Sequence, residues 1–170
     1  MKLRKLIPCI VALCLAVPAL AQMNGERGKA EATVKGKKIT IDYGRPSLQG
    51  RDMLSQAKPG MVWRLGMNQA TQIDTDGDLM VAGKTVPAGK YTLWAKKVGD
   101  ANWVLAFHPK TGIWGSPEMT EGFVAELPLK MATAKDSADK LTISLADMKG
   151  QAGIKIQWGT ALLSGSFGVK

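Results

Sequence analysis

The sequence predicts an all-β protein: a single-domain antiparallel β-sandwich of about nine strands, with at most one short helix. Three observations favour this class. Apolar and polar residues alternate with a period of two through most of the chain, as they do in a strand with one buried face. Turn signals such as Asp76-Gly77 separate these runs at the short spacing typical of sandwiches. Only residues 52–58, which stop at Pro59, have a helical pattern, and it is one or two turns long.

The start of the chain predicts export. Residues 1–21 have the layout of a signal peptide: basic residues, an apolar run, and the A-x-A cleavage site Ala19-Leu20-Ala21. The apolar run is too short to span a membrane, so we expect no transmembrane segment after cleavage. The mature protein is expected in the periplasm or outside the cell. It consists of a polar leader over residues 22–29 and one β-sandwich domain over residues 30–170.

Composition limits how this domain is stabilised. Both cysteines, Cys9 and Cys14, lie in the signal peptide, so the mature chain has no disulfide to form and depends on its core. Removing 21 of the 170 residues leaves 149, with 20 basic and 14 acidic side chains. The lysines are dispersed, which is typical of a basic soluble protein, and no basic-aromatic motif points to nucleic acid.

The strands in the first part of the chain follow from alternation and from the turns between them. Gly36-Lys37 suits a two-residue turn, and Asp76-Gly77 tolerates the positive φ angles of a tight hairpin. Pro87-Ala88-Gly89 suits a type I turn, because proline presets φ at its second position. The strands expected here cover residues 30–34, 39–43, 62–75, 78–82, 91–96 and 103–107.

The second part of the chain contains the remaining strands. Residues 123–129 alternate, and Pro128 predicts an edge strand because proline donates no hydrogen bond to a ladder. Residues 135–140 are polar on both faces and are expected to be a connection. The last strands are expected at residues 141–145, 154–158 and 161–169.

Several motifs, taken in their order along the chain, resemble one known family. They are Y-G-R-P-S (43–47), V-W-R-L-G-M-N-Q-A-T (62–71), G-K-T-V-P-A-G-K-Y-T-L-W (83–94), W-V-L-A-F (103–107), W-G (114–115), L-T-I-S-L (141–145) and Q-W-G (157–159). The chain resembles the secreted bacterial family known as domain of unknown function 2911. The resemblance covers nearly the whole mature chain and implies an exported β-rich domain. It implies no activity, ligand or catalytic residue.

Five residues near these motifs are candidates for ligand binding: Tyr43, Arg45, Trp63, Arg64 and Asn68. Arginine presents a planar fork suited to carboxylate or phosphate, and asparagine both donates and accepts hydrogen bonds. The aromatic rings add stacking faces. The alternative is structural, with the arginines bound to loop carbonyls or to an acid such as Asp42, and with Trp63 in the core.

Two further residues are possible additions to that site, and metals are not expected. His108 is the one histidine, and a loop position before Pro109 favours an exposed or loop-capping role over catalysis. Trp114, in a loop, is the best candidate for a sugar platform. One histidine without cysteine cannot complete a zinc site. The alternating acids of D-T-D-G-D (74–78) lack the later ligands of a calcium loop, and a hairpin explains them. We expect no cofactor and assign no catalytic residue.

The sequence favours a non-catalytic module that binds a small anionic or polyhydroxylated ligand. The alternative from a different class is an envelope-associated domain that contacts a partner through its basic surface and an edge strand. A third possibility is a hydrolase that uses His108 or a pair of carboxylates. The expected partners are accordingly a small polar ligand or a component of the cell envelope.

Overall fold

A computed structural model describes residues 25–51, 54, 56–115 and 119–170. The expected all-β class is confirmed: the described residues form ten strands and no helix, and every strand pairing is antiparallel. The expected signal peptide lies outside the described residues, as do Asp52, Met53 and Ser55 of the expected helix; Leu54 and Gln56 lie in turns. In the described part of the chain, no helix has the length and hydropathy needed to cross a membrane.

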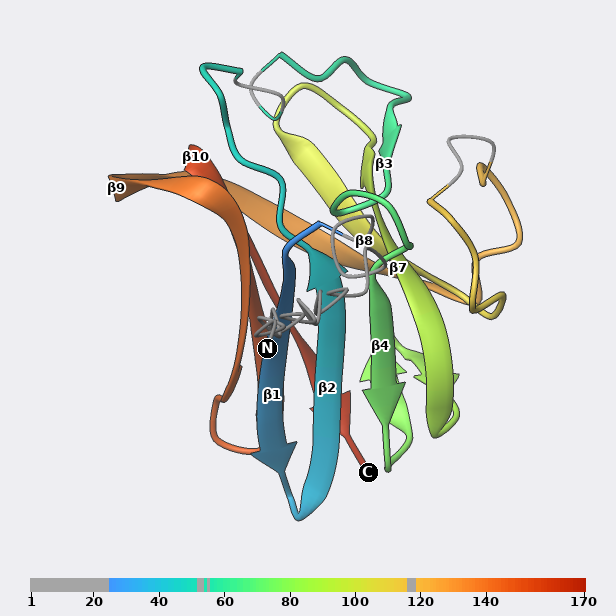
Figure 1. Ribbon diagram of the computed structural model, residues 1–170. Coiled ribbons are helices and arrows are strands. Elements are labelled where there is room, and N and C mark those ends of the chain that lie inside the picture. The colour runs from blue at the N-terminus through green and yellow to red at the C-terminus, as the bar shows by residue number, and fades with distance from the viewer. Residues whose placement is uncertain (1–24, 52–53, 55, 116–118) are drawn as a thin grey trace, which may run out of the picture.

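The ten strands belong to one continuous sheet. Its order is β1-β2-β4-β7-β8-β9-β10-β5-β6, and β3 pairs with β7 outside this path. The sheet curves strongly, so that β9 and β10 lie behind β1 and β2 in Figure 1. The strands are β1 (Arg27–Val34), β2 (Lys37–Gly44), β3 (Val62–Trp63), β4 (Gln72–Thr75), β5 (Leu79–Val81), β6 (Lys84–Val86), β7 (Gly89–Lys97), β8 (Asn102–His108), β9 (Ala125–Asp147) and β10 (Gln151–Val169).

Tight turns between neighbouring strands have the geometry that matches the twist of a hairpin. Both central residues have positive φ at Lys35-Gly36, at Ala82-Gly83 and at Lys149-Gly150. Each turn places glycine second, where it adopts this conformation without a steric penalty. The three turns join β1 to β2, β5 to β6 and β9 to β10.

The curved sheet encloses the main hydrophobic core. Alternate residues of the strands point into it, for example Ile39, Ile41 and Tyr43 of β2. A second, smaller cluster lies on the other face of β7 and β8, where Trp94 and Ala106 pack beneath Ile113 and Phe123. The segment after β8 therefore covers part of the outer face of the sheet.

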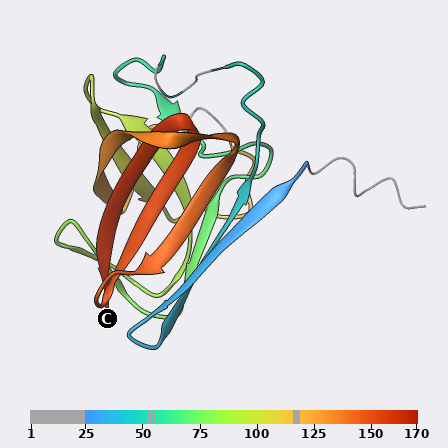
Figure 2. The ribbon, with the colours of Figure 1, turned by 90° about the vertical axis from the view of Figure 1, so that its left-hand side faces the viewer.

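The hairpin of β9 and β10 differs most from expectation. Residues 135–140 belong to β9 rather than to a loop. The register shifts on both sides of Gly159, which has a φ of +64°, and here the hairpin bends. Figure 2 shows its two halves folded side by side, so that β10 runs up through residues 151–159 and back down through 161–169.

Candidate functional site

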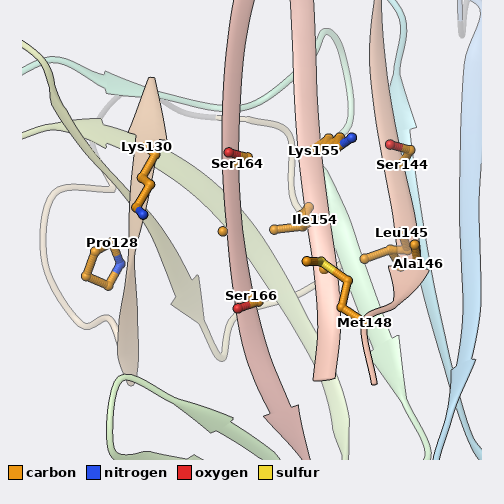
Figure 3. Close-up of a pocket in the computed structure, with 12 residues that line it drawn as sticks. Pro128, Lys130, Ser144, Leu145, Ala146, Met148, Ile154, Lys155, Ser164 and Ser166 are labelled. Carbon is orange, nitrogen blue, oxygen red and sulfur yellow. The ribbon is translucent and has the colours of Figure 1, made fainter. Parts of the chain in front are cut away.

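The bent hairpin carries a groove of about 610 Å³ on its surface. Figure 3 shows the strand segments that border it side by side: β9 at Pro128 and Lys130, β10 at Ser164 and Ser166, β10 again at Ile154 and Lys155, and β9 again at Ser144, Leu145 and Ala146. The bend near Gly159 brings these segments, which are far apart in the sequence, onto one face.

Local sequence explains why the surface is hollow here. Pro128 pairs with Val104 of β8 but offers no N–H, and the ladder between β9 and β10 ends two residues further on, at Lys130 and Ser164. Pro128 was expected to mark an edge strand, and β9 lacks a strand partner at this residue only on the side that faces β10. Glycines remove bulk: a Cβ on Gly153 would lie 2.2 Å from the sulfur of Met148, whose side chain covers it.

The chemistry of the groove is that of a surface that receives an anion. Lys130 and Lys155 supply two ammonium groups, and neither is in an ion pair with a described residue. No Asp or Glu is among its described lining residues, whereas Ser144, Ser164 and Ser166 are. The floor is apolar, formed by the buried Ile154 together with half-buried Leu145 and the edge of Met148.

The predicted ligand-binding residues Tyr43 and Arg45 lie elsewhere, at the end of β2, where they hold β2 to β9. The Tyr43 hydroxyl donates to the carbonyl of Ile143 (3.3 Å) and accepts the Ile143 N–H (3.0 Å). Arg45 donates from Nε to the carbonyl of Leu141 (3.2 Å) and from Nη1 to Glu26 (2.8 Å). Both side chains thus make contacts within the fold, and their role in ligand binding stays a prediction.

Trp63 is also held within the fold. It is half-buried on β3, packs against the main core, and stacks on Trp158 of β10 with ring centroids 5.8 Å apart and planes 6° apart. The ring therefore links the short strand β3 to the top of the bent hairpin.

Arg64 and Asn68 lie in a tight loop that replaces the middle of the strand expected over 62–75, between β3 and β4. Leu65 and Asn68 have positive φ, and the Thr71 hydroxyl donates to the carbonyl of Leu65 (2.6 Å). The loop sits on β2 at Gly44. Arg64 is exposed and lies against Gly115, and the role of Arg64 and Asn68 in ligand binding stays a prediction.

His108 ends β8 beside the segment that covers the outer face. Its Nδ1 accepts the N–H of Lys110 (3.0 Å), and its ring meets Phe123 edge-on with centroids 5.6 Å apart. Burial, and then the charge of Lys110, lower the pKa of His108 below its usual value. The imidazole is therefore neutral near pH 7 and caps a loop.

Trp114 is the most exposed large apolar side chain of the described residues, at 60%. It forms an isolated antiparallel bridge with Gln69, and the neighbouring Gly115 N–H donates to the carbonyl of Asn68 (3.1 Å). Backbone pairing thus fixes this residue in place although its side chain meets solvent.

Sequence reasoning missed the groove because nothing in its residue types is unusual. Serine, lysine and alanine on the polar face of a strand are ordinary, and none of the groove residues was a candidate. The available signal was Pro128, which marked where a strand would lose a partner. Residues 164–166, Ser-Gly-Ser, weakened the final strand in the same region.

Comparison with known proteins gives a family but no activity. Among the described residues, no group of three or more His, Cys, Asp or Glu side chains is placed to hold a metal ion. A search of curated proteins and a search of solved structures each found no match. A family described as a protein of unknown function, DUF2911, matches residues 26–166. The order of motifs and the all-β fold agree with this match, and the chain belongs to the DUF2911 family.

Proposed function

We propose that the protein is an exported, non-catalytic module that binds a small anionic ligand in the groove of the β9–β10 hairpin. One observation carries the proposal: a groove of about 610 Å³ is bordered by two lysines and three serines, with no acidic residue among those that line it. Cavities that hold small molecules occupy roughly 300–1,000 Å³, so the groove has a suitable size.

The distribution of groups suggests what the ligand looks like. An ammonium is a point charge that attracts a carboxylate or phosphate, and serine hydroxyls rotate to donate or accept. The half-buried Leu145 and the exposed Met148 offer apolar contact in the groove. Burying apolar surface contributes roughly 25 cal/mol per Å², so a ligand with an apolar body gains more there than a bare anion does. A carboxylate on a short hydrocarbon chain suits both parts.

The experiment is a thermal-shift and calorimetric titration of the mature protein with decanoate, decanol and inorganic phosphate. Decanoate should raise Tm and bind, because a ligand that prefers the native state stabilises it. Decanol, which lacks the charge, should bind more weakly. If none of the three probes shifts Tm or releases heat, the proposal is wrong.

Substitutions of residues that line the groove test whether decanoate binds there. Changing Lys130 and Lys155 together to Ala should weaken decanoate binding about tenfold, the effect of losing roughly 1.4 kcal/mol. The matched control changes Lys84 and Lys135, exposed lysines outside the groove, and should bind as the parent does. Ala146→Trp should block the groove without unfolding the protein, because this side chain is exposed. Unchanged affinity in both groove variants would place the ligand elsewhere.

A further inference from the structure

A second cavity lies at the other side of the sheet, where β1, β2 and β4 meet the segment before Trp114. It has a volume of about 150 Å³. Arg27, Asp42, Gln69 and Gln72 line it with polar side chains, and Gly112 and Ile113 close one wall. None of these residues lines the groove, so the two cavities are independent.

Several polar groups of this cavity have no hydrogen-bond partner within the described part of the chain. Arg27 donates from Nε to Oδ1 of Asp42 (2.5 Å), and its Nη2 donates to the same oxygen. Within the described part of the chain, Arg27 Nη1 is buried and has no hydrogen-bond partner. The side-chain amides of Gln69 and Gln72 likewise make no hydrogen bond to a described residue. The two side-chain amides and the second carboxylate oxygen of Asp42 thus remain for a ligand that both donates and accepts.

An aromatic ring stands at the rim of this cavity. Gln69 and Trp114 are directly opposed in an antiparallel bridge. Residues opposed in this way project their side chains to the same face of the pair. Trp114 is not itself among the residues that line the cavity, but it lies opposite Gln69, which is. The Ala70 N–H donates to the carbonyl of Ile113 (3.0 Å), which fixes the two segments together on that side.

We infer that this cavity, with Trp114 at its rim, is a binding site for one ring of a neutral sugar. Sugar hydroxyls are donors and acceptors at once, which matches a carboxylate flanked by amides. The C–H face of the ring packs on an exposed indole, whose burial removes a large apolar surface from water. The Asp42 carboxylate disfavours an anion, in contrast to the lysine-bordered groove. The volume of about 150 Å³ limits the buried part to a single ring.

The test titrates the mature protein with glucose and N-acetylglucosamine, using tryptophan fluorescence and calorimetry. Saturable binding with a Kd on the order of 1 mM is expected, and it should change the fluorescence of Trp114. Galacturonate, which carries a carboxylate, should bind more weakly than the neutral sugars. Absence of binding by all neutral sugars up to about 10 mM, ten times the expected Kd, would overturn the inference.

Variants distinguish this site from the groove. Gln69→Ala with Trp114→Ala should weaken sugar binding by about tenfold or more, because it removes an amide and the stacking face. Both side chains are exposed, so the fold should remain intact, which Tm checks. The control, Gln56→Ala with Val98→Ala, changes exposed residues outside the cavity and should bind normally. Ala146→Trp should leave sugar affinity unchanged. Sugar binding that survives in the Gln69/Trp114 variant would refute the assignment.

Discussion

The loop over residues 64–70 and the groove of the β9–β10 hairpin use hydrogen-bonding residues in opposite ways. The loop is rich in such groups, and contacts within the fold hold it in a tight turn. The Thr71 hydroxyl donates to the carbonyl of Leu65, and the loop backbone packs on Gly44. The groove is made of common residues whose lysine ammonium groups remain unpaired within the described part of the chain. Here a dense local cluster of polar residues marks a constrained turn, whereas a cavity arises from the bend of two long strands.

Of the changes that test this comparison, Gly44→Ala has the largest expected effect on stability. An added Cβ would lie 2.2 Å from the carbonyl oxygen of Met67, so the loop cannot keep its seat on β2. We expect the free energy of unfolding to fall by about 3 kcal/mol or more, as measured in urea. Gly99→Ala is the control, since its Cβ would first meet the movable side chain of Asn102 at 3.2 Å. Equal stability of the two variants would show that the loop does not depend on this contact.

Tyr43→Phe should have an intermediate effect. The hydroxyl satisfies both the N–H and the carbonyl of Ile143 in a buried place, and the change leaves both without that partner. Leaving buried polar groups unsatisfied costs about 1–3 kcal/mol. Tyr91→Phe is the matched control, because the Tyr91 hydroxyl donates only to the carbonyl of Pro87 and should contribute less. A loss no greater than that of the control would mean that the Tyr43 hydroxyl does not help to hold β2 to β9.

Lowering the pH should have the smallest effect on stability. It should act through carboxylates near β1 and β2 rather than through the groove. Hydrogen bonds from Lys29 and then Lys38 lower the pKa of Glu31 from 4.5 to about 2. The bond from Lys140, followed by the charges of Lys140 and Arg45, lowers that of Glu26. A carboxyl with a lowered pKa in the folded state stabilises it above the unfolded value, and this contribution is lost as pH falls.

We therefore expect Tm to decline slightly as pH is lowered from about 4.5 toward 2, with the effect weakened by salt because these pairs are exposed. Glu31→Gln should flatten part of the decline. Decanoate binding should fall where the ligand itself becomes protonated. A Glu31→Gln protein with an unchanged pH profile would show that Glu31 does not carry this part of the stability.

Much of the fold could be predicted from the sequence because alternation is a local property. The pattern identified the buried faces, such as Ile39 and Ile41 on β2 and Leu141 on β9. The long strand β9 was missed over residues 135–140, where both faces are largely exposed and no alternation exists to detect. Partners such as β10 and β5 are distant in sequence, and alternation assigns a face but no neighbour.

The candidate sites were less predictable than the fold. Residue types drew attention to Arg45, but its contact with Leu141 depends on the docking of β9 beside β2, and its contact with Glu26 depends on the pairing of β1 with β2. The groove depends on a change of register at Gly159, and no residue type announces the cavity that results. Trp114 was a candidate from its loop position, whereas Gln72 and Asp42 join it only through strand pairing.

The parallel stack of Trp63 on Trp158 has a spectroscopic consequence. Two indoles held face to face with centroids 5.8 Å apart have electronic transitions that couple, and where the two transition dipoles are rotated relative to one another the coupling gives a paired positive and negative band in ultraviolet circular dichroism. Such a signal would distort any estimate of strand content made from that spectrum. It would also give an optical reading, without an added label, of whether β3 remains docked on the hairpin.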